Sequence, residues 1–324
     1  MTIVRPAHDP ELDAALEIIL QSMPVGTMNE ETVLAMRDAN LELMPGLAED
    51  ELAALGIIRR ELEIPVYEGA LVKVSVFARS DHAGTGPGIY HVNGGGMITG
   101  HRLLGIQQCL PWIVEHDAVV LTVEYRLAPE FPDPYPVEDS YAGLVWMHAN
   151  APQLGIDPAQ ILIAGASAGG GLSAGTALLA RDRKGPALVG QVLMCPMLDD
   201  RDESASTEQI TENSTWTRDS NRYGWSSLLG ERKGGENVSI YAAPARAEDL
   251  SGLPPTYIDC GSAEVFRDED VAYASKLWEA GIDAELHVWA GGFHGFDMMA
   301  PHAAVSQAAI AARDSWVARH IGRR

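Results

Sequence analysis

The sequence predicts an α/β protein with a mostly parallel central sheet that helices cover on both faces. Short apolar runs of strand length alternate with longer helical segments, and this alternation is typical of such a sheet. The chain has 324 residues, of which 46% are hydrophobic, so it can form one large domain with an accessory cap and does not need two independent cores. A polar segment, residues 199–247, interrupts the alternation once.

The predicted elements follow one another in a regular order. Residues 11–58 have helical periodicity with breaks at Pro24 and Pro45-Gly46. An antiparallel pair of strands comes next, Leu62–Tyr67 and Leu71–Ala78. The remaining predicted strands are Ile89–Val92, Ala118–Glu124, Ile161–Ala164, Gly190–Cys195, Pro255–Asp259 and Ala284–Trp289. The remaining predicted helices are Val137–Asn150, Ala168–Arg183, Asp268–Ala280 and Ala303–His320.

Composition excludes several classes of partner. Acidic residues outnumber basic residues by 45 to 23, which gives a formal net charge of −22 and disfavours binding to nucleic acid or to an anionic membrane. The three cysteines, Cys109, Cys195 and Cys260, have no C-x-x-C spacing and lie in or near apolar segments. They predict reduced, buried thiols, which favour the cytoplasm.

Neither secretion nor membrane insertion is expected. The N-terminal residues lack an apolar core of signal-peptide length before Asp9 and Glu11. Residues 161–180 carry no charge and are about as long as a membrane span. They consist, however, of a predicted strand, a glycine-rich turn and a helix of small residues, which is the pattern of a soluble core.

Ser167 is a candidate nucleophile. It lies in Gly165-Ala166-Ser167-Ala168-Gly169, between a predicted strand and a predicted helix. A serine at a sharp strand-to-helix turn presents its hydroxyl above the sheet, and flanking glycines remove side chains that would clash in the bend. The G-x-S-x-G string alone is weak evidence in a chain with 32 glycines. The assignment of Ser167 therefore depends on whether the sequence also contains a base, an acid and an oxyanion hole.

The other residues that a serine nucleophile needs are also present, and the acid and the histidine come after the serine in the chain. The loop Asn93-Gly94-Gly95-Gly96 comes after a predicted strand and offers backbone N–H groups that, with that of Ala168, can hold an oxyanion. Glu264 and His294 each come shortly after a predicted strand. Serine, then acid, then histidine is the chain order of one known class of serine hydrolases. Asp268, one helical turn after Glu264, is a rival for the role of the acid.

Several motifs in fixed order carry a resemblance to a known family. They are the triple glycine at 94–96, Glu124-Tyr125-Arg126-Leu127-Ala128-Pro129-Glu130 with Pro136 and Glu138-Asp139, Ser167-Ala168-Gly169-Gly170, Leu250-Ser251-Gly252-Leu253-Pro254-Pro255, Glu264-Val265-Phe266-Arg267-Asp268 and His294-Gly295-Phe296. On these motifs the chain resembles the hormone-sensitive-lipase-like esterases, the bacterial family IV of the α/β-hydrolase superfamily. The match extends from about residue 60 to the C-terminus.

The resemblance implies roles for particular residues. Ser167 would be the nucleophile, His294 the general base and then acid, and Glu264 the carboxylate that orients the imidazole. Gly94, Gly95 and Ala168 would form the oxyanion hole. It also implies an α/β-hydrolase fold whose catalytic domain spans 59–198 and 248–324. Residues 1–58 and 199–247 would form a helical cap over the serine.

Three departures from the family pattern stand out. Asn93 replaces the usual histidine before the glycines, Ala166 stands where an aspartate or similar residue often lies, and Glu264 replaces the commoner aspartate. None of them removes a catalytic atom, although Asn93 bears on the shape of the alcohol pocket. Four aromatic residues of segment 199–247 are candidates either for the substrate wall or for anchors of the cap: Trp216, Tyr223, Trp225 and Tyr241.

The expected function is hydrolysis of small or short-acyl carboxylic esters through an acyl-enzyme, with no metal or organic cofactor required. The preference for short acyl groups is implied by the resemblance. The same triad can cleave a lactone or an amide, and a related fold with a dead site can serve as a ligand receptor. The partner is therefore a small ester, and a homodimer through the apolar strand Ala284–Trp289 is a further hypothesis.

Overall fold

The computed structural model describes residues 4–22, 27–43 and 48–321. One eight-stranded sheet runs through it in the order β1-β2-β4-β3-β5-β6-β7-β8. The strands are β1 (Ile57–Pro65), β2 (Leu71–Arg79), β3 (Gly86–Val92), β4 (Val119–Val123), β5 (Ile156–Ala166), β6 (Gly190–Met194), β7 (Thr256–Gly261) and β8 (Ala284–Trp289). The predicted breaks at Pro24 and Pro45-Gly46 lie outside the described residues.

Most of the sheet is parallel. β1 pairs with β2, and β2 with β4, in antiparallel register. The strands from β4 through β3, β5, β6 and β7 to β8 are all parallel to one another. Their carboxyl ends therefore meet at one edge, which is where open α/β sheets carry their ligands. The predicted α/β class with a mostly parallel sheet is confirmed.

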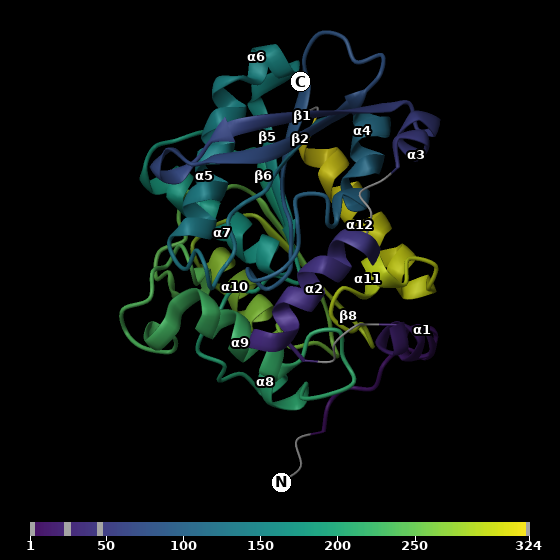
Figure 1. Cartoon of the computed structure of the whole chain (residues 1–324), viewed down its shortest axis with the longest axis vertical. Helices are drawn as coiled ribbons and strands as arrows, with labels where there is room; N and C mark the ends of the chain where they lie inside the picture. Colours follow the sequence, from purple (N-terminus) through teal and green to yellow (C-terminus); the bar gives the residue numbers. More distant parts are fainter. Residues whose placement is uncertain (1–3, 23–26, 44–47, 322–324) are drawn as a thin grey trace.

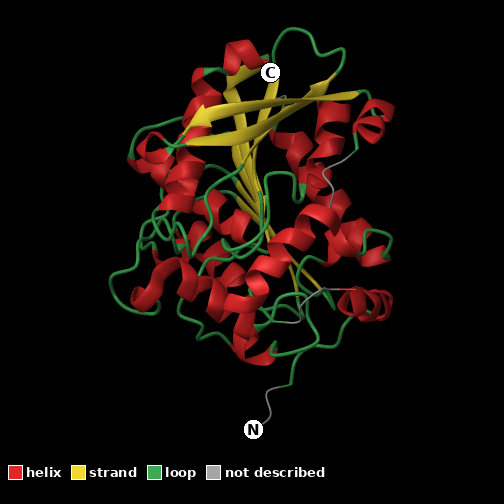
Figure 2. Cartoon of the chain, in the orientation of Figure 1, coloured by secondary structure: helices red, strands yellow, loops and turns green. Residues whose placement is uncertain are grey.

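Helices cover both faces of the sheet (Figures 1 and 2). They are α1 (Pro10–Ser22), α2 (Glu30–Leu43), α3 (Glu49–Ala54), α4 (Leu110–His116), α5 (Tyr135–Ala149), α6 (Ala151–Leu154), α7 (Ala168–Asp182), α8 (Ala205–Gln209), α9 (Arg218–Leu229), α10 (Arg267–Glu279), α11 (Phe296–Met299) and α12 (Ala304–His320). In Figure 1, α5, α7 and α10 lie on one side of the sheet, and α4 and α12 lie on the other.

A hydrophobic core lies on each face of the sheet. Each strand contributes to both cores, because successive side chains of a strand point to opposite faces. In β3, Ile89 joins the core under α4 and α12, and Tyr90 joins the core under α5 and α7. In β5, Leu162 and Ile163 divide in the same way. The sheet is thus buried on both sides, as its nearly continuous apolar strands require.

The first strand differs from its prediction. β1 begins at Ile57, five residues before the expected Leu62, so the N-terminal helical segment ends at α3 and the expected boundary after residue 58 lies inside β1. The reason is that β1 is an edge strand. Exposed edge strands tolerate charged side chains, and Arg59, Arg60 and Glu61 therefore concealed the strand from apolar periodicity.

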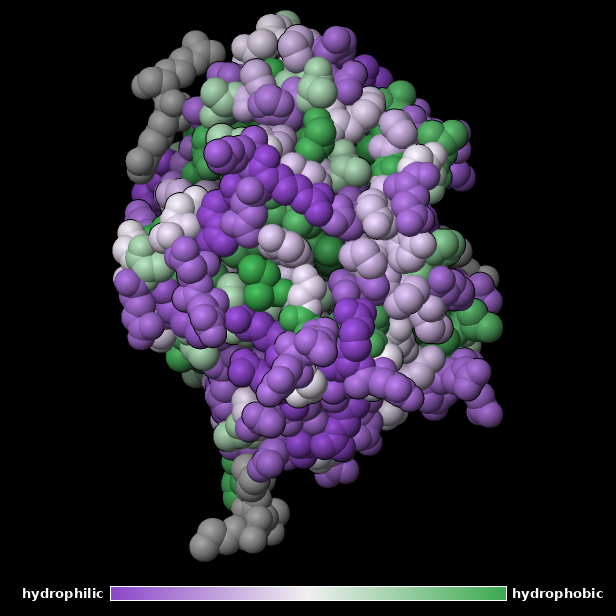
Figure 3. All heavy atoms as spheres, turned by 90° about the vertical axis from the view of Figure 1, so that its left-hand side faces the viewer, coloured by the Kyte–Doolittle hydropathy of each residue, from purple (hydrophilic) through white to green (hydrophobic). Residues whose placement is uncertain are grey.

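Residues 161–180 divide as predicted into the end of β5, a turn and most of α7. Among the residues that the structure describes, none of the helices combines the length and the apolar character needed to cross a bilayer. Figure 3 shows a face that is mostly hydrophilic, with hydrophobic residues in small separate groups.

A charged anchor fixes α2 against the loops that follow β3 and β4. The guanidinium of Arg37 donates to both carboxylate oxygens of Glu130 at 2.7 and 2.9 Å. It also donates to the backbone oxygens of Ala128 and Ile98. Because Ile98 belongs to the loop after β3, this anchor holds α2 beside the glycine loop 94–96.

Candidate active site

Ser167 occupies a strained turn between β5 and α7. Its φ is 58° and its ψ is −124°, a backbone conformation that a residue with a side chain adopts only when the surroundings enforce it. Three backbone hydrogen bonds do so. The Ser167 N–H donates to Met194 O, and the Ser167 carbonyl accepts from Gly171 N–H and Met197 N–H. The turn therefore projects the hydroxyl beyond the carboxyl end of the sheet.

The flanking glycines are required by close backbone approaches. A Cβ on Gly165 would lie 2.2 Å from Gly169 O, and a Cβ on Gly169 would lie 2.1 Å from Val92 O. Both distances are far below van der Waals contact. The steric role expected for these glycines is thus present in the structure, where it lets α7 pack directly against β5 and β3.

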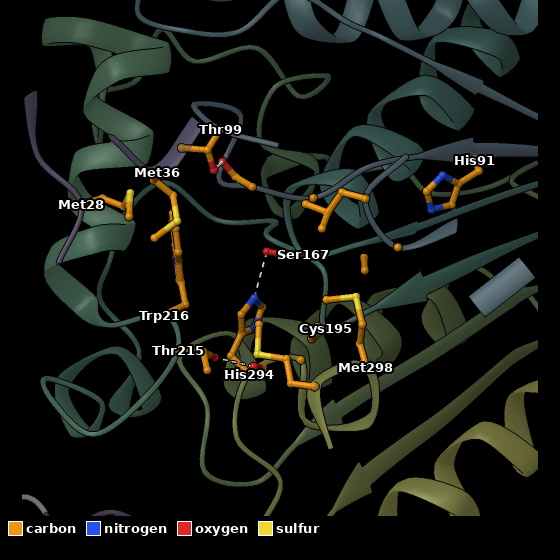
Figure 4. Close-up of a pocket in the computed structure, with 17 residues that line it drawn as sticks. Met28, Met36, His91, Thr99, Ser167, Cys195, Thr215, Trp216, His294 and Met298 are labelled. Carbon is orange, nitrogen blue, oxygen red and sulfur yellow. Dashed lines mark hydrogen bonds between the residues drawn. The ribbon is translucent and has the colours of Figure 1, made fainter. Parts of the chain in front are cut away.

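His294 and Glu264 converge on Ser167 from neighbouring strands. Glu264 follows β7 and His294 follows β8. The imidazole Nε2 lies 2.9 Å from Ser167 Oγ, and Nδ1 lies 2.6 Å from Glu264 Oε2. The Glu264 side chain is fully buried and that of His294 is 9% exposed. The Thr215 hydroxyl donates to the His294 carbonyl at 2.5 Å, and Figure 4 shows the imidazole directed at the serine hydroxyl.

The rival carboxylate points elsewhere. Asp268 accepts from Ser206 N–H at 2.8 Å and from Arg267 Nε at 2.7 Å. Hydrogen bonds from Arg267 and Ser206 lower the pKa of its carboxyl against the opposing effect of partial burial. Asp268 therefore joins α10 to α8, and the structure brings Glu264, rather than Asp268, to the histidine.

The glycine loop lies beside the serine. A Cβ on Gly94 would meet Ala166 O at 2.9 Å and Ser167 Cβ at 3.3 Å. In the described part of the chain, the backbone N–H groups of Gly94, Gly95 and Ala168 donate no hydrogen bond. Ala168 is the first residue of α7, where N–H groups have no partner within the helix. Three unused donors thus lie close to Ser167.

Asn93 braces this loop. Its Nδ2 donates to Gly94 O at 2.9 Å, and its carbonyl accepts from the Tyr125 hydroxyl. The side chain is almost fully buried. The amide and the carbonyl of Asn93 therefore help to hold the glycine loop in place.

A cavity of about 140 Å³ opens at Ser167. Its wall contains Met28 and Met36 from the N-terminal segment, Trp216, and Met298 and Met299 of α11. No lysine, arginine, aspartate or glutamate is among the described residues that line it. The methionines were missed by the sequence analysis, because a methionine on an amphipathic helix has the same pattern whether it faces a core or a cavity.

The four aromatic candidates divide between the two roles. Trp216 lines the cavity and lies over Gly96. Trp225 is fully buried in the hydrophobic core, and the Tyr241 hydroxyl donates to Asp182. Tyr223 packs against the same core. One of the four is therefore a wall residue, and the others anchor segment 199–247.

His91 also lines the cavity. It is buried, and its Nδ1 lies 3.2 Å from Thr122 Oγ1. Because Thr122 itself donates to Arg102 O, it accepts from His91, which fixes the proton on Nδ1. Burial lowers the pKa of His91 to about 4, so the imidazole is neutral near pH 7.

Two groups of side chains around Glu264 lie close enough together to offer ligand atoms to a metal ion. Cys195, Glu264 and His294 offer atoms within 4.8 Å of one another. Both imidazole nitrogens of His294, however, are already engaged, one by Glu264 and the other by Ser167. The same carboxylate belongs to the other close group, Cys260, Glu264 and Asp270, so neither group is assigned as a metal site.

Residues 89–298 match a family model described as the alpha/beta hydrolase fold. The chain belongs to the α/β-hydrolase family. Carboxylesterase NlhH of Mycobacterium tuberculosis is 33% identical over 313 residues, which cover 91% of this chain and 92% of that protein. These findings confirm the resemblance to the hormone-sensitive-lipase-like esterases.

Solved structures of α/β hydrolases superimpose on nearly the whole chain. A bacterial heroin esterase has a TM-score of 0.88 and 38% identity, and the match covers 97% of this chain and 98% of that one. Esterase LipW from Mycobacterium marinum has a TM-score of 0.86 and 30% identity, over 99% of both chains. These esterase structures therefore share with this chain the N-terminal segment as well as the sheet.

Proposed function

We propose that this chain is a serine carboxylic-ester hydrolase that cleaves small or short-acyl esters through an acyl-enzyme. One observation carries the proposal: His294 bridges Ser167 and Glu264, with distances of 2.9 and 2.6 Å, at the floor of an apolar cavity. The esterases among its relatives support the same class of reaction.

The chemistry follows from this geometry. His294 Nε2 takes the proton of the Ser167 hydroxyl as its oxygen attacks the ester carbonyl. Glu264 holds Nδ1, fixes the tautomer and stabilises the imidazolium. The imidazolium then gives its proton to the departing alcohol, which leaves an acyl group on Ser167. Water, activated by the same imidazole, releases the acid and restores the serine.

The oxyanion hole consists of the backbone N–H groups of Gly94, Gly95 and Ala168. These donors flank Ser167, and none of them donates a hydrogen bond to another residue in the described ranges. Each donor of this kind stabilises the tetrahedral intermediate by about 3–4 kcal/mol. Gly94 suits the role because any side chain there would press on Ala166 and Ser167.

The substrate is a small uncharged ester. The cavity of about 140 Å³ is lined by thioether, indole and small side chains, which favour apolar groups. A charged acyl or alcohol group would find no counter-charge among the described lining residues. Methionine side chains adapt to differently shaped apolar groups, so several alcohols are compatible with this wall.

Residues 1–58, of which the last two already belong to β1, and residues 199–247 act as the cap, since Met28, Met36 and Trp216 line the cavity at the serine from these segments. The catalytic domain comprises the remaining parts, 59–198 and 248–324. The three cysteines are free thiols, which supports a reducing compartment, the cytoplasm.

The proposal is tested by hydrolysis of p-nitrophenyl esters of increasing acyl length, with wild type and Ser167→Ala, in the presence of a chelator. The expected result is turnover that is the same with and without the chelator and is greatest for short acyl groups. This turnover disappears in Ser167→Ala. Absence of turnover on every ester by folded wild-type protein would overturn the proposal, and lactones and amides would then be assayed.

A further inference from the structure

A second buried carboxyl lies behind the carboxylate that faces His294. Asp270, in the first turn of α10, is fully buried, as is Glu264. Oxygen atoms of the two side chains lie within 4.8 Å of each other and of the Cys260 sulfur. The cluster is therefore shielded from solvent, in contrast to most carboxyl groups of this acidic chain.

Three oxygens of this pair have no partner. Glu264 Oε2 contacts His294, but Glu264 Oε1 and both carboxylate oxygens of Asp270 have no hydrogen-bond partner among the described residues. Leaving a buried carboxylate oxygen without a donor is costly. Two negative charges this close in a buried site repel each other, and a proton on Asp270 relieves that repulsion. The same proton supplies a donor.

The surroundings decide which residue carries the proton. Glu264 faces His294, whose imidazolium stabilises a negative charge on Glu264 in the transition state. Asp270 faces acidic groups and a thiol: Glu264, Glu269, Asp259 and Cys260. The cation of the same helical turn, Arg267, binds Asp268, Ser262 O and Gln209 instead. Burial, followed by the charge of Glu264, raises the pKa of Asp270 well above its usual range, and the Cys260 thiol beside it, a weak donor, only partly opposes this rise.

We propose that Asp270 is a positioning residue that stays protonated and donates a hydrogen bond to Glu264 Oε1, which holds Oε2 against His294 Nδ1. This rests on the proposed function, because Asp270 acts through Glu264 on the reacting histidine. The proton of Asp270 is not transferred during turnover. Because Asp270 is neutral, Glu264 carries the one negative charge at the end of the triad. This charge is matched by the one positive charge that forms on His294.

Two substitutions separate the donor from the charge. Asp270→Asn keeps a donor of the same size and cannot ionise, whereas Asp270→Ala removes the donor. Asp268→Asn is the matched control, because it removes a carboxylate two residues away that contacts Ser206 and Arg267 rather than Glu264. For each variant, kcat, KM and the pH profile of kcat/KM are measured, and thermal unfolding verifies the fold.

The expected results distinguish positioning from a structural role. Asp270→Asn retains kcat and leaves the acid limb of the kcat/KM profile in place, as Asp268→Asn does. Asp270→Ala lowers kcat about tenfold, the rate equivalent of one hydrogen bond, without raising KM. Were Asp270 ionised, Asp270→Asn would remove a negative charge near His294 and shift the acid limb to lower pH by about half a unit or more. That shift, or a wild-type kcat in Asp270→Ala, would overturn the proposal.

An infrared measurement decides the protonation state without turnover. The difference spectrum between wild type and Asp270→Asn at neutral pH is expected to contain the carbonyl stretch of a protonated carboxylic acid. A carboxylate band in its place would overturn the proposal even if Asp270→Ala fails to fold. Since this readout needs no substrate, loss of the proposed esterase function would leave it intact, and the two failures can be told apart.

Discussion

At the scale of single residues, chain position alone left two carboxylates as candidates for the acid. Glu264 and Asp268 are one helical turn apart, and the direction of their side chains separates them: Glu264 contacts His294, whereas Asp268 contacts Ser206 and Arg267. A sequence cannot give this direction, because it depends on where α8 packs against α10. The choice of Glu264 is therefore best tested by exchanging each carboxylate for its amide.

Glu264→Gln is expected to lower kcat by about 10³–10⁴-fold, because an amide cannot hold the reactive tautomer or stabilise the imidazolium. Asp268→Asn is expected to stay within about threefold of wild type, since a contact remote from the reacting atoms changes the transition state little. The measurement is steady-state hydrolysis of p-nitrophenyl acetate by proteins with matched circular dichroism spectra. Full activity of Glu264→Gln combined with loss in Asp268→Asn would give the role to Asp268.

His91 is expected to make stability depend on pH. Burial lowers the pKa of His91 from 6.5 to about 4. Between these two pH values the imidazole is therefore protonated in the unfolded state but neutral in the folded state. The resulting stability is present above pH 6.5 and is lost as the pH falls toward 4. The shift corresponds to about 3 kcal/mol.

Urea unfolding at several pH values tests this prediction. His91→Asn can keep the donor to Thr122 but does not titrate, so its stability is expected to fall less between pH 6.5 and 4 than that of wild type. His302→Asn, at an exposed position, serves as the control and is expected to retain the wild-type slope. Equal slopes in all three proteins would contradict the account of His91.

At the scale of elements, α11 divides two cavities. Met298 and Met299 both line the cavity at Ser167, and of these two only Met298 also lines a neighbouring cavity of about 350 Å³. The second cavity is bordered by Pro111, Pro301 and Ile310 on its apolar side and by Asp297, Arg313 and Asp314 on its charged side. The thioether of Met298 is thus part of the partition between them.

Met298→Ala is expected to connect the cavities and to shift the acyl-length profile toward longer p-nitrophenyl esters. Met299→Ala removes the same number of atoms from the first cavity alone and is expected to leave the longest accepted chain unchanged. The readout is kcat/KM for each acyl length. An equal shift in both variants would mean that added volume, rather than the partition, sets the limit.

Strands and strand-to-loop junctions were the most predictable elements. Apolar runs located β3 to β8, and the glycines around Ser167 located the turn, because close packing leaves a clear pattern in the sequence. The predicted start of β1 lay five residues too far along the chain, because charged side chains on an edge strand hide its apolar periodicity. The cavity wall escaped prediction, because Met28 and Met298 come from segments far apart in the chain and meet only in the folded molecule.

At the scale of the whole molecule, β8 closes one edge of the sheet. Its outer backbone groups have no strand partner in the described part of the chain, and Val288 and Trp278 of this region are exposed. Such an edge favours pairing with a second copy across a two-fold axis.

We expect a homodimer through β8, with twice the mass of one chain by light scattering at micromolar concentration. Val288→Lys is expected to give the monomer, because a charge on the exposed edge opposes pairing. A wild-type monomer under these conditions would remove the hypothesis.

The parallel sheet explains why distant residues form one site. β5, β7 and β8 run in the same direction, so the residues that follow them, Ser167, Glu264 and His294, emerge at the same edge. Met28, Met36 and Trp216 then cover this edge with apolar side chains and narrow the access of water. The proposed reaction thus depends on the topology of the whole sheet.

The most direct test is to trap the acyl-enzyme. Wild-type protein is mixed with p-nitrophenyl acetate, and the reaction is quenched in acid within milliseconds. The mass of the intact protein is then measured by mass spectrometry, and peptide mapping locates the modified residue. The account predicts a mass increase of one acetyl group, located on Ser167 and absent from Ser167→Ala. Turnover without a covalent intermediate, or an acetyl group on another residue of a still active Ser167→Ala protein, would contradict it.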